Sequence, residues 1–205
     1  MLYHGIAIKP GKPAVLARVG SKPVLGVPGY PVSGIYNKSY IRRYFPDGDG
    51  VLLRCAGRVQ GLMVAPGNPL GIRGFQDISR LRYVNRQGGS GTRILCDHLL
   101  KENGLDSSRI NGYSREEFTN TAVAAQIAAG TADAGLGIFS AAKLYGLDFI
   151  PICNEKYDLL LKAENLEMPL VKDFLQILKG EEFRRRLENL GGYVLENPGE
   201  VIEQT

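Results

Sequence analysis

The strongest constraint on the fold is an order of strand, turn and capped helix that occurs twice between residues 82 and 138, the first time with a glycine-rich turn. In the first copy the strand-like LRYVN is followed by the loop RQGGSG and then by TRILCDHLLKENG. This last segment places four apolar residues on one helical face, and Asn103-Gly104 supplies a C-terminal stop. A chain of 205 residues can bury a core without disulfides or metals, so the pattern predicts an α/β fold.

The second copy begins after INGY, which has the composition of a short strand. SREEFTN leads into the helical TAVAAQIAAG, capped by Thr or Asn, and ADAGLGIF follows as a strand with a single charge. We therefore expect a parallel βαβαβ unit over residues 82–138, with helices that begin within a residue or two of Gly91 and Thr121. Ligands of such units gather at the carboxyl ends of the strands.

The flanking segments predict further elements. VLLRC and GLMVA are interpreted as two strands, and LDFIPI and YDLLL as two more. Helices are expected over residues 35–44, 140–145, 169–179 and 181–190. In the first 34 residues short β-branched runs alternate with Pro and Gly, which favours two or three strands joined by tight turns.

Composition excludes several classes of protein. The net charge of +4 is small and its basic residues are dispersed, which argues against direct binding of nucleic acid. Three widely spaced cysteines without a CxxC pair are typical of reduced thiols in a cytoplasm. The N-terminus lacks the pattern of a secretory signal, and the least charged stretch, residues 121–142, contains Asp133 and three glycines. We expect a cytoplasmic protein without a membrane span.

The glycine-rich loop before the first helix is the leading candidate for a ligand site. Gly89 and Gly91 let the backbone approach a ligand closely, while Ser90 and Thr92 offer hydroxyls where the helix begins. Unpaired amides and the helix dipole favour an anion at such a terminus, and Arg93 is placed to reinforce it. Two alternatives stay open: the hydroxyls only cap the helix, and Arg93 is an ordinary surface residue.

Two further positions are candidates for the same site. Thr119 and Asn120 open the second helix, and neighbouring strand–helix turns of a doubly wound lobe face one edge, so these residues are expected to converge with Ser90. Tyr157 is the third candidate. The alternatives are a second helix cap and an ordinary strand residue with a half-buried ring.

The sequence contains no recognisable catalytic motif. Neither His4 nor His98 has a carboxylate or cysteine at metal-ligand spacing, and no nucleophile elbow is present. We therefore expect no catalytic residues, no metal and no cofactor.

Residues 36–200 resemble the periplasmic-binding-protein-like domain that prokaryotes fuse to molybdopterin molybdotransferases or to molybdate-type regulators. The resemblance rests on five motifs in order: QGLMVAPGNP (60–69), YVNRQGGSGTR (83–93), GYSREEFTNTAVAAQIAAGTADAGLGI (112–138), LDFIPICNEKYDLLL (147–161) and LGGY (190–193). It implies the type II architecture, in which two α/β lobes close on a ligand. It also implies a small oxyanion as ligand, molybdate or tungstate, with Ser90, Thr92 and Thr119 as donors.

Residues 4–33 resemble a different protein, the late part of a molybdotransferase catalytic domain. PGKP and the loop PGYPVS carry this likeness, but the family's acidic and glycine-rich catalytic segments do not precede them. The binding domain also joins at YNKSYIRRYFP, without the strand–helix units that begin a complete first lobe. The expected organisation is a β-rich fragment over 1–34 and a binding domain with an incomplete first lobe over 35–205.

Three functions follow from these observations. The first is an oxyanion sensor or carrier linked to molybdenum cofactor synthesis, whose partners are the small anion and the proteins of that synthesis. The second is a molybdotransferase fragment, for which the missing metal-binding carboxylates argue against autonomous activity. The third is an interaction protein that forms a homodimer through an exposed sheet edge.

Overall fold

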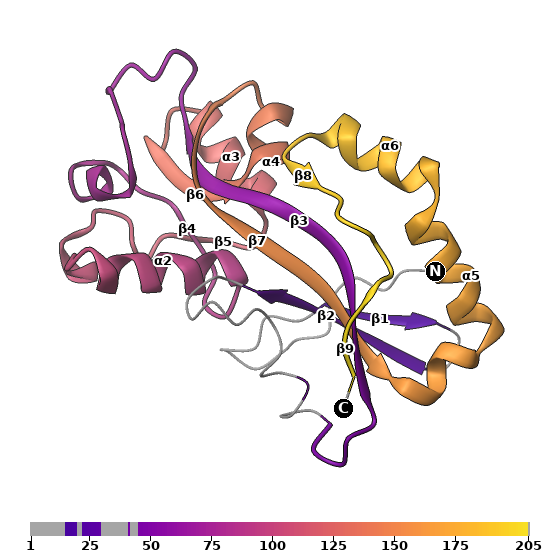
Figure 1. Ribbon diagram of the computed structural model, residues 1–205. Coiled ribbons are helices and arrows are strands. Elements are labelled where there is room, and N and C mark those ends of the chain that lie inside the picture. The colour runs from indigo at the N-terminus through magenta and orange to yellow at the C-terminus, as the bar shows by residue number, and fades with distance from the viewer. Residues whose placement is uncertain (1–14, 20–21, 30–40, 42–44, 205) are drawn as a thin grey trace.

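Two long antiparallel strands organise the molecule. The computed structural model describes residues 15–19, 22–29, 41 and 45–204. In it β3 (Gly50–Val64) and β7 (Asp148–Lys162), each of 15 residues, pair from one end to the other and cross the molecule diagonally (Figure 1). The register shifts twice, between Arg54 and Ala56 and between Gln60 and Gly61.

Each of these strands was expected to be two, and that prediction is wrong. VLLRC and GLMVA both lie in β3, while LDFIPI and YDLLL both lie in β7. The polar residues that separate the apolar runs do not form turns. In β3 they belong to the half-buried middle of the strand, Arg54 to Val59, and both ends of that strand are buried.

Five other strands extend this pair into one sheet, whose main order is β1-β2-β7-β3-β6, while β4 (Asn85–Arg86) and β5 (Glu116–Glu117) form a separate two-stranded sheet. β1 (Val15–Val19) and β2 (Lys22–Gly29) form a hairpin, and β2 pairs antiparallel with β7. The other edge of β3 pairs with β6 (Ala134–Ile138), β8 (Tyr193–Val194) and β9 (Val201–Gln204). All pairings of the larger sheet are antiparallel, and the N-terminal hairpin belongs to the same sheet as the long strands.

Residues 65–147 form one lobe, which contains the two strand–helix units. After a 3-10 turn, η1 (Phe75–Arg80), the elements are β4 (Asn85–Arg86), α2 (Gly91–Glu102), η2 (Ser107–Arg109), β5 (Glu116–Glu117), α3 (Asn120–Ala128), β6 and α4 (Phe139–Leu144). β4 pairs parallel with β5, and Tyr83 forms a parallel bridge with Ala134. The parallel unit and both helix starts are therefore confirmed.

INGY is not a strand, contrary to prediction. Ile110 is buried at the end of η2, and Gly112 has a φ of +94°, a turn conformation that a strand does not contain. A Cβ at Gly112 would also lie 2.0 Å from the carbonyl oxygen of Tyr83, so the turn can pass this close only with glycine. The strand of this segment is β5, four residues further on.

The other lobe contains the far ends of β3 and β7, the hairpin and two helices. η3 (Ala163–Glu167) leads into α5 (Pro169–Lys179) and α6 (Glu181–Leu190), whose bounds are those predicted. Of the helix predicted over 35–44, only Ile41 is among the described residues. No helix in the described part of the chain has the length and apolar character needed to cross a membrane.

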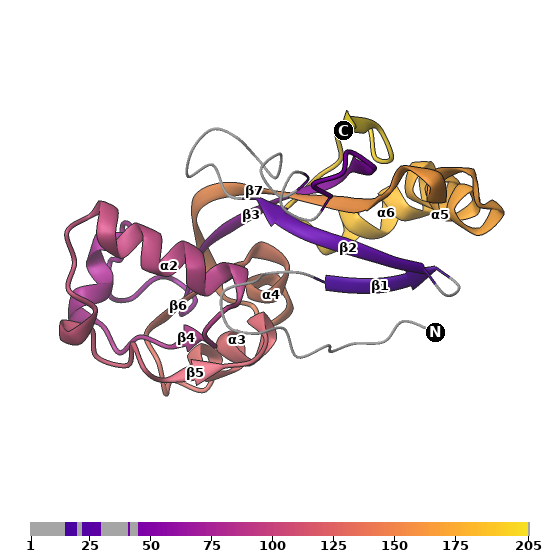
Figure 2. The ribbon, with the colours of Figure 1, turned by 90° about the horizontal axis from the view of Figure 1, so that it is seen from below.

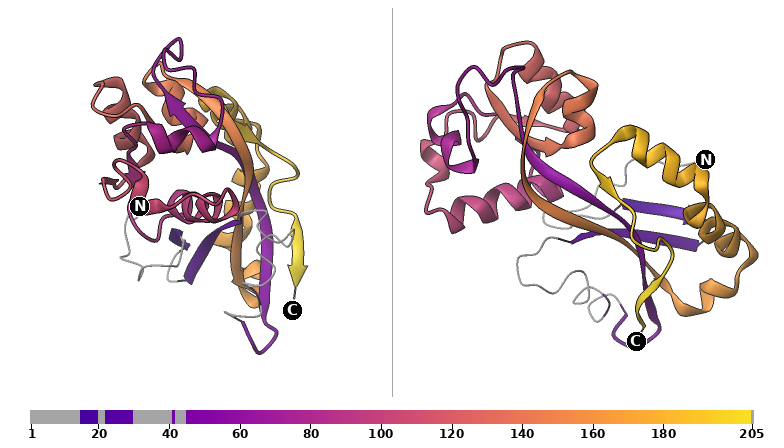
Figure 3. Two further views of the ribbon diagram at one scale, coloured as in Figure 1. Left: turned by 90° about the vertical axis from the view of Figure 1, so that its left-hand side faces the viewer. Right: turned by 45° about the horizontal axis from the view of Figure 1, so that its top comes forward.

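Each lobe has a hydrophobic core of its own. Val51 and Leu53 of β3 pack with α5 in one lobe, while Leu62 and Val64 pack with Tyr83 and its neighbours in the other. Figures 2 and 3 show that the long strands run between the two groups of helices. The polar middle of β3 and β7 thus lies between the lobes, where ligands bind in two-lobed proteins.

Candidate functional site

The N terminus of α2 has the geometry of an anion site. Gly89 turns the loop with a φ of +84°, and the Ser90 hydroxyl caps the helix by accepting from the Arg93 amide at 3.2 Å. The amides of Gly91 and Thr92 have no hydrogen-bond partner among the residues that the structure describes. Since the Ser90 hydroxyl accepts one bond and keeps its proton, it can also donate to a ligand. Capping and ligand binding are compatible here.

Thr92 connects this terminus to the long strands. Its side chain is only 3% exposed, and its hydroxyl donates to Oε1 of Gln60 on β3 at 3.0 Å. Gln60 in turn donates from Nε2 to Oε2 of Glu155 on β7 at 3.0 Å, and Arg58 donates to the same oxygen. A buried chain of polar side chains therefore runs from the helix across both strands.

Glu155 is the most unusual member of this chain. Its side chain is fully buried, and in the described part of the chain its Oε1 has no hydrogen-bond partner, although Oε2 accepts from both Gln60 and Arg58. Leaving a buried acceptor unsatisfied costs about 1–3 kcal/mol, more for a charged group, and such groups are rare in folded proteins. An acceptor of this kind marks a place where a donor from outside the chain would be stabilised.

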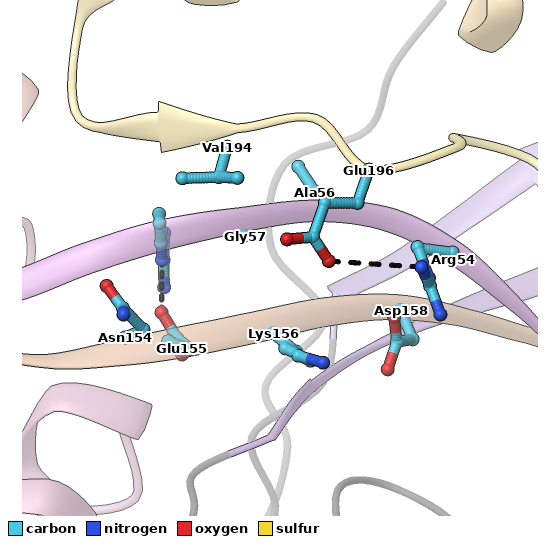
Figure 4. A pocket seen from close by; sticks show the side chains of 10 residues that line it. Arg54, Ala56, Gly57, Asn154, Glu155, Lys156, Asp158, Val194 and Glu196 are labelled. Carbon is cyan, nitrogen blue, oxygen red and sulfur yellow. Dashed lines mark hydrogen bonds and ion pairs between the residues drawn. The ribbon is translucent and has the colours of Figure 1, made fainter.

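Glu155 also lines a cavity of about 160 Å³ between β3, β7 and the C-terminal segment (Figure 4). The other lining residues mix both charges: Arg54, Ala56, Gly57, Arg58, Asn154, Lys156, Asp158, Val194 and Glu196. A cavity near 150 Å³ holds a molecule of benzene size. The volume fits a ligand of a few heavy atoms, and the paired charges fit one that is itself polar.

The strand that carries Glu155 also carries two groups affected by burial. Tyr157, predicted as a ligand residue, is half-buried, and burial raises the pKa of its phenol while the nearby Arg58 opposes the shift. The Arg58 guanidinium lies 5.9 Å from the Tyr157 ring centroid. Burial, helped by the charge of Glu155, raises the pKa of the Cys153 thiol to about 11. Both side chains are therefore neutral at pH 7.

Arg93 is held by other side chains of its own lobe. Its guanidinium donates to Asp97 at 2.9 Å and to Glu116 at 2.5 Å, and lies 4.3 Å from the ring centroid of Tyr113. Burial works to lower the pKa of Arg93, but these hydrogen bonds outweigh it and raise the pKa. Glu116 also accepts from the Gly88 amide at 3.3 Å. An anion bound to Arg93 would compete with two carboxylates of the chain.

The second helix turn lies beside the first, as expected. Arg86 of β4 donates to Oδ1 of Asn120 at 2.7 Å and to the carbonyl oxygen of Phe118 at 3.0 Å, across the β4–β5 pairing. Thr119 caps α3 by accepting from the Ala122 amide at 2.9 Å. The two turns are thus connected through Arg86, and the prediction that Thr119 and Ser90 hold one ligand stays a prediction.

Sequence reasoning missed Arg58, Gln60 and Glu155. A signal was present in RVQGLMV, where Arg58 and Gln60 occupy alternate positions next to an apolar run and hence share one face of a strand. Glu155 had no such signal, because its pairing with β3 joins positions 97 residues apart. In the described ranges no group of three or more His, Cys, Asp or Glu side chains is placed to hold a metal ion.

Comparison with known proteins identifies the family. A model of the PBP superfamily domain, the periplasmic-binding-protein superfamily, matches residues 30–179. The chain belongs to this superfamily. Together with the two-lobed α/β architecture, the match shows the type II binding-protein fold that the motifs predicted.

Two relatives have no described activity. The uncharacterized protein YvgK of Bacillus subtilis (strain 168) is 35% identical over 175 residues, which are 84% of this chain and 56% of that protein. An uncharacterized protein in the ferredoxin 2Fe-2S gene 5'region of Clostridium pasteurianum is 37% identical over 112 residues, 54% of this chain and 99% of that protein. The chain thus spans little more than half the length of the Bacillus relative. Neither name supports the molybdotransferase or molybdenum link, which stays a prediction.

Solved structures show the same fold at low identity. The regulatory domain of CcmR from Synechocystis PCC6803, in complex with 2-PG, has a TM-score of 0.52 and 18% identity, covering 64% of this chain and 66% of that one. The probable amino-acid ABC transporter extracellular-binding protein ytmK from Bacillus subtilis has a TM-score of 0.50 and 17% identity, with coverages of 70% and 65%.

Proposed function

We propose that this chain binds a small anionic solute between its lobes, at the N terminus of α2 and the polar middle of β3 and β7. One observation carries the proposal: the hydrogen bond from Thr92 to Gln60 holds the N terminus of α2 beside the crossing strands. The amides of Gly91 and Thr92 and the Ser90 hydroxyl supply donors without any rearrangement of the chain. Membership of a superfamily of ligand-binding domains supports the same function.

The ligand is a small oxyanion or organic anion, and molybdate and tungstate are the first oxyanions to test. Their support is the resemblance of the motifs to domains fused to molybdotransferases. The charges of the site weigh against a bare dianion, because the carboxylate of Glu155 lies two hydrogen bonds from Thr92 and, among the described residues, forms an ion pair with Arg58. In the cell the module acts as a sensor or carrier in a cytoplasm, alone or joined to proteins of molybdenum cofactor synthesis.

Titration calorimetry with molybdate, tungstate, sulfate, phosphate and small carboxylates tests this function. We expect at least one anion to bind, and Ser90→Ala to weaken it more than tenfold, since a hydrogen bond to a charged ligand is worth about 1.5–3 kcal/mol. Thr119→Ala is expected to weaken it as well if the second turn takes part. Ser79→Ala, which removes a hydroxyl that donates to the Gln76 carbonyl in η1, is the matched control and should leave affinity unchanged.

Two results would contradict the proposal. No heat of binding with any of these anions would exclude the function itself. Binding that Ser90→Ala and Thr119→Ala leave as tight as in the parent would show that both hydroxyls only cap their helices, and that the anion sits elsewhere.

A further inference from the structure

The unpartnered oxygen of Glu155 restricts which anions fit the proposed site. Its Oε1 is buried and accepts no hydrogen bond from the residues that the structure describes, and Glu155 is one of the residues that line the cavity between β3, β7 and the C-terminal segment. Its other oxygen is already bonded to Gln60 and Arg58, which fixes the carboxylate in place. The group is therefore preorganised to accept one more hydrogen bond from a donor in the cavity.

Resting on the proposed function, we propose that the ligand is an anion that carries its own hydrogen-bond donor. The anionic end binds at the amides of Gly91 and Thr92, and the donor end bonds to Oε1 of Glu155. A hydroxyl or ammonium group on a small organic acid provides this chemistry, and so does the P–OH of hydrogen phosphate. Fully deprotonated oxyanions such as sulfate and molybdate do not.

The preference follows from what an unmatched ligand would leave behind. An anion without a donor would place its own acceptors against a buried carboxylate, so that two negative groups face one another without a proton between them. A site built to accept a hydrogen bond rejects an analogue that lacks the donor more strongly than it rejects one that differs only in size. Selection therefore comes from the penalty on the wrong anion as much as from the bond with the right one.

Two matched pairs of probes test the inference by calorimetry. Glycolate and acetate differ by one hydroxyl, and hydrogen phosphate and sulfate differ by the retained proton. A further comparison, glycine with acetate, tests an ammonium group as the donor. We expect the donor-bearing member of at least one pair to bind about tenfold tighter or more, and the pair that shows it identifies the source of the donor.

Glu155→Gln then assigns the preference to this side chain. Its amide can turn its NH₂ group toward a ligand that lacks a donor, so the preference is expected to fall to less than about threefold. Glu102→Gln, at the far end of α2, makes the same change of charge at an exposed residue and should leave the preference intact. If Glu155→Gln does not fold, as judged by circular dichroism, the parent's own discrimination within each pair still decides the question.

The possible results separate this inference from the function on which it rests. Anions that bind with equal affinity within every pair would overturn the inference and leave the binding function standing. A preference that survives in folded Glu155→Gln would overturn it too, because another group would then be the acceptor. If none of the probes binds the parent, the proposed function fails and the inference falls with it.

Discussion

Replacing Thr92 by valine should destabilise the protein through a single lost hydrogen bond. Valine has nearly the shape of threonine, so the buried site stays filled while the donor to Gln60 is removed. The Gln60 side chain is fully buried and no solvent can replace the donor. Loss of one partner of a buried hydrogen bond costs about 1–3 kcal/mol, which for a chain of this size lowers Tm by roughly 2–4 °C per kcal/mol.

Urea denaturation followed by far-ultraviolet circular dichroism measures this loss, since the chain has no tryptophan to report by fluorescence. Thr121→Val is the matched control. Thr121 is exposed in the first turn of α3, and its hydroxyl forms a hydrogen bond with that of the neighbouring Thr119, so its replacement should change stability by less than about 0.5 kcal/mol.

A double-mutant cycle shows whether the effect passes through Gln60. Combining Thr92→Val with Gln60→Leu should cost less than the sum of the two single replacements, because each removes the same bond. If Thr92→Val matched the parent's stability within 0.5 kcal/mol, or if the two replacements were additive, the seating of α2 on β3 would not depend on this contact.

Two other predictions concern the framework of the site. Gly61→Ala should lower stability by roughly 3 kcal/mol or more in urea denaturation, because the new Cβ would lie 2.2 Å from the Ile150 carbonyl oxygen, while Gly88→Ala, with open space at its Cβ, should change it little. Asp133→Asn should cost roughly 1 kcal/mol at pH 7, because the hydrogen bond from Arg82 lowers the pKa of Asp133. A carboxylate with a lowered pKa contributes stability above its unfolded pKa, near 3.9, and loses that contribution as pH falls through its folded pKa. The stabilities of the two proteins should therefore converge as pH falls below about 4. A difference that persisted at about pH 2 would assign the effect to packing.

The local signals of the sequence predicted the helices well and the sheet poorly. The start of α2 at Gly91 and the bounds of α5 and α6 were predicted because caps, glycines and apolar spacing act within a few residues. The lengths of β3 and β7 were missed, because a strand that passes between two cores is apolar at its ends and polar in its middle. A polar middle resembles a turn when only neighbouring residues are considered.

The candidate site divides in the same way. Ser90 and its glycines were found because a helix terminus is a local motif, and the structure shows Ser90 capping that terminus. The partners of Thr92 were not found, since its bond to Gln60 joins positions 32 residues apart and the bond from Arg58 to Glu155 joins positions 97 apart. Contacts between residues so far apart cannot be predicted from the spacing of residues in a single sequence.

The LGGY motif, at the end of α6, shows how the lobes are held on either side of this site. Gly191 and Gly192 have φ values of +78° and +73°, and a Cβ at Gly192 would lie 2.5 Å from the Cβ of Phe139 on α4. Lys143 of α4 donates to the Asn189 carbonyl oxygen at 2.8 Å. The lobes therefore contact one another at α4 as well as through the long strands. Because both connections are made within the chain itself, the network from Thr92 to Glu155 forms without a ligand, and a ligand bound there would lose little free energy to ordering the site.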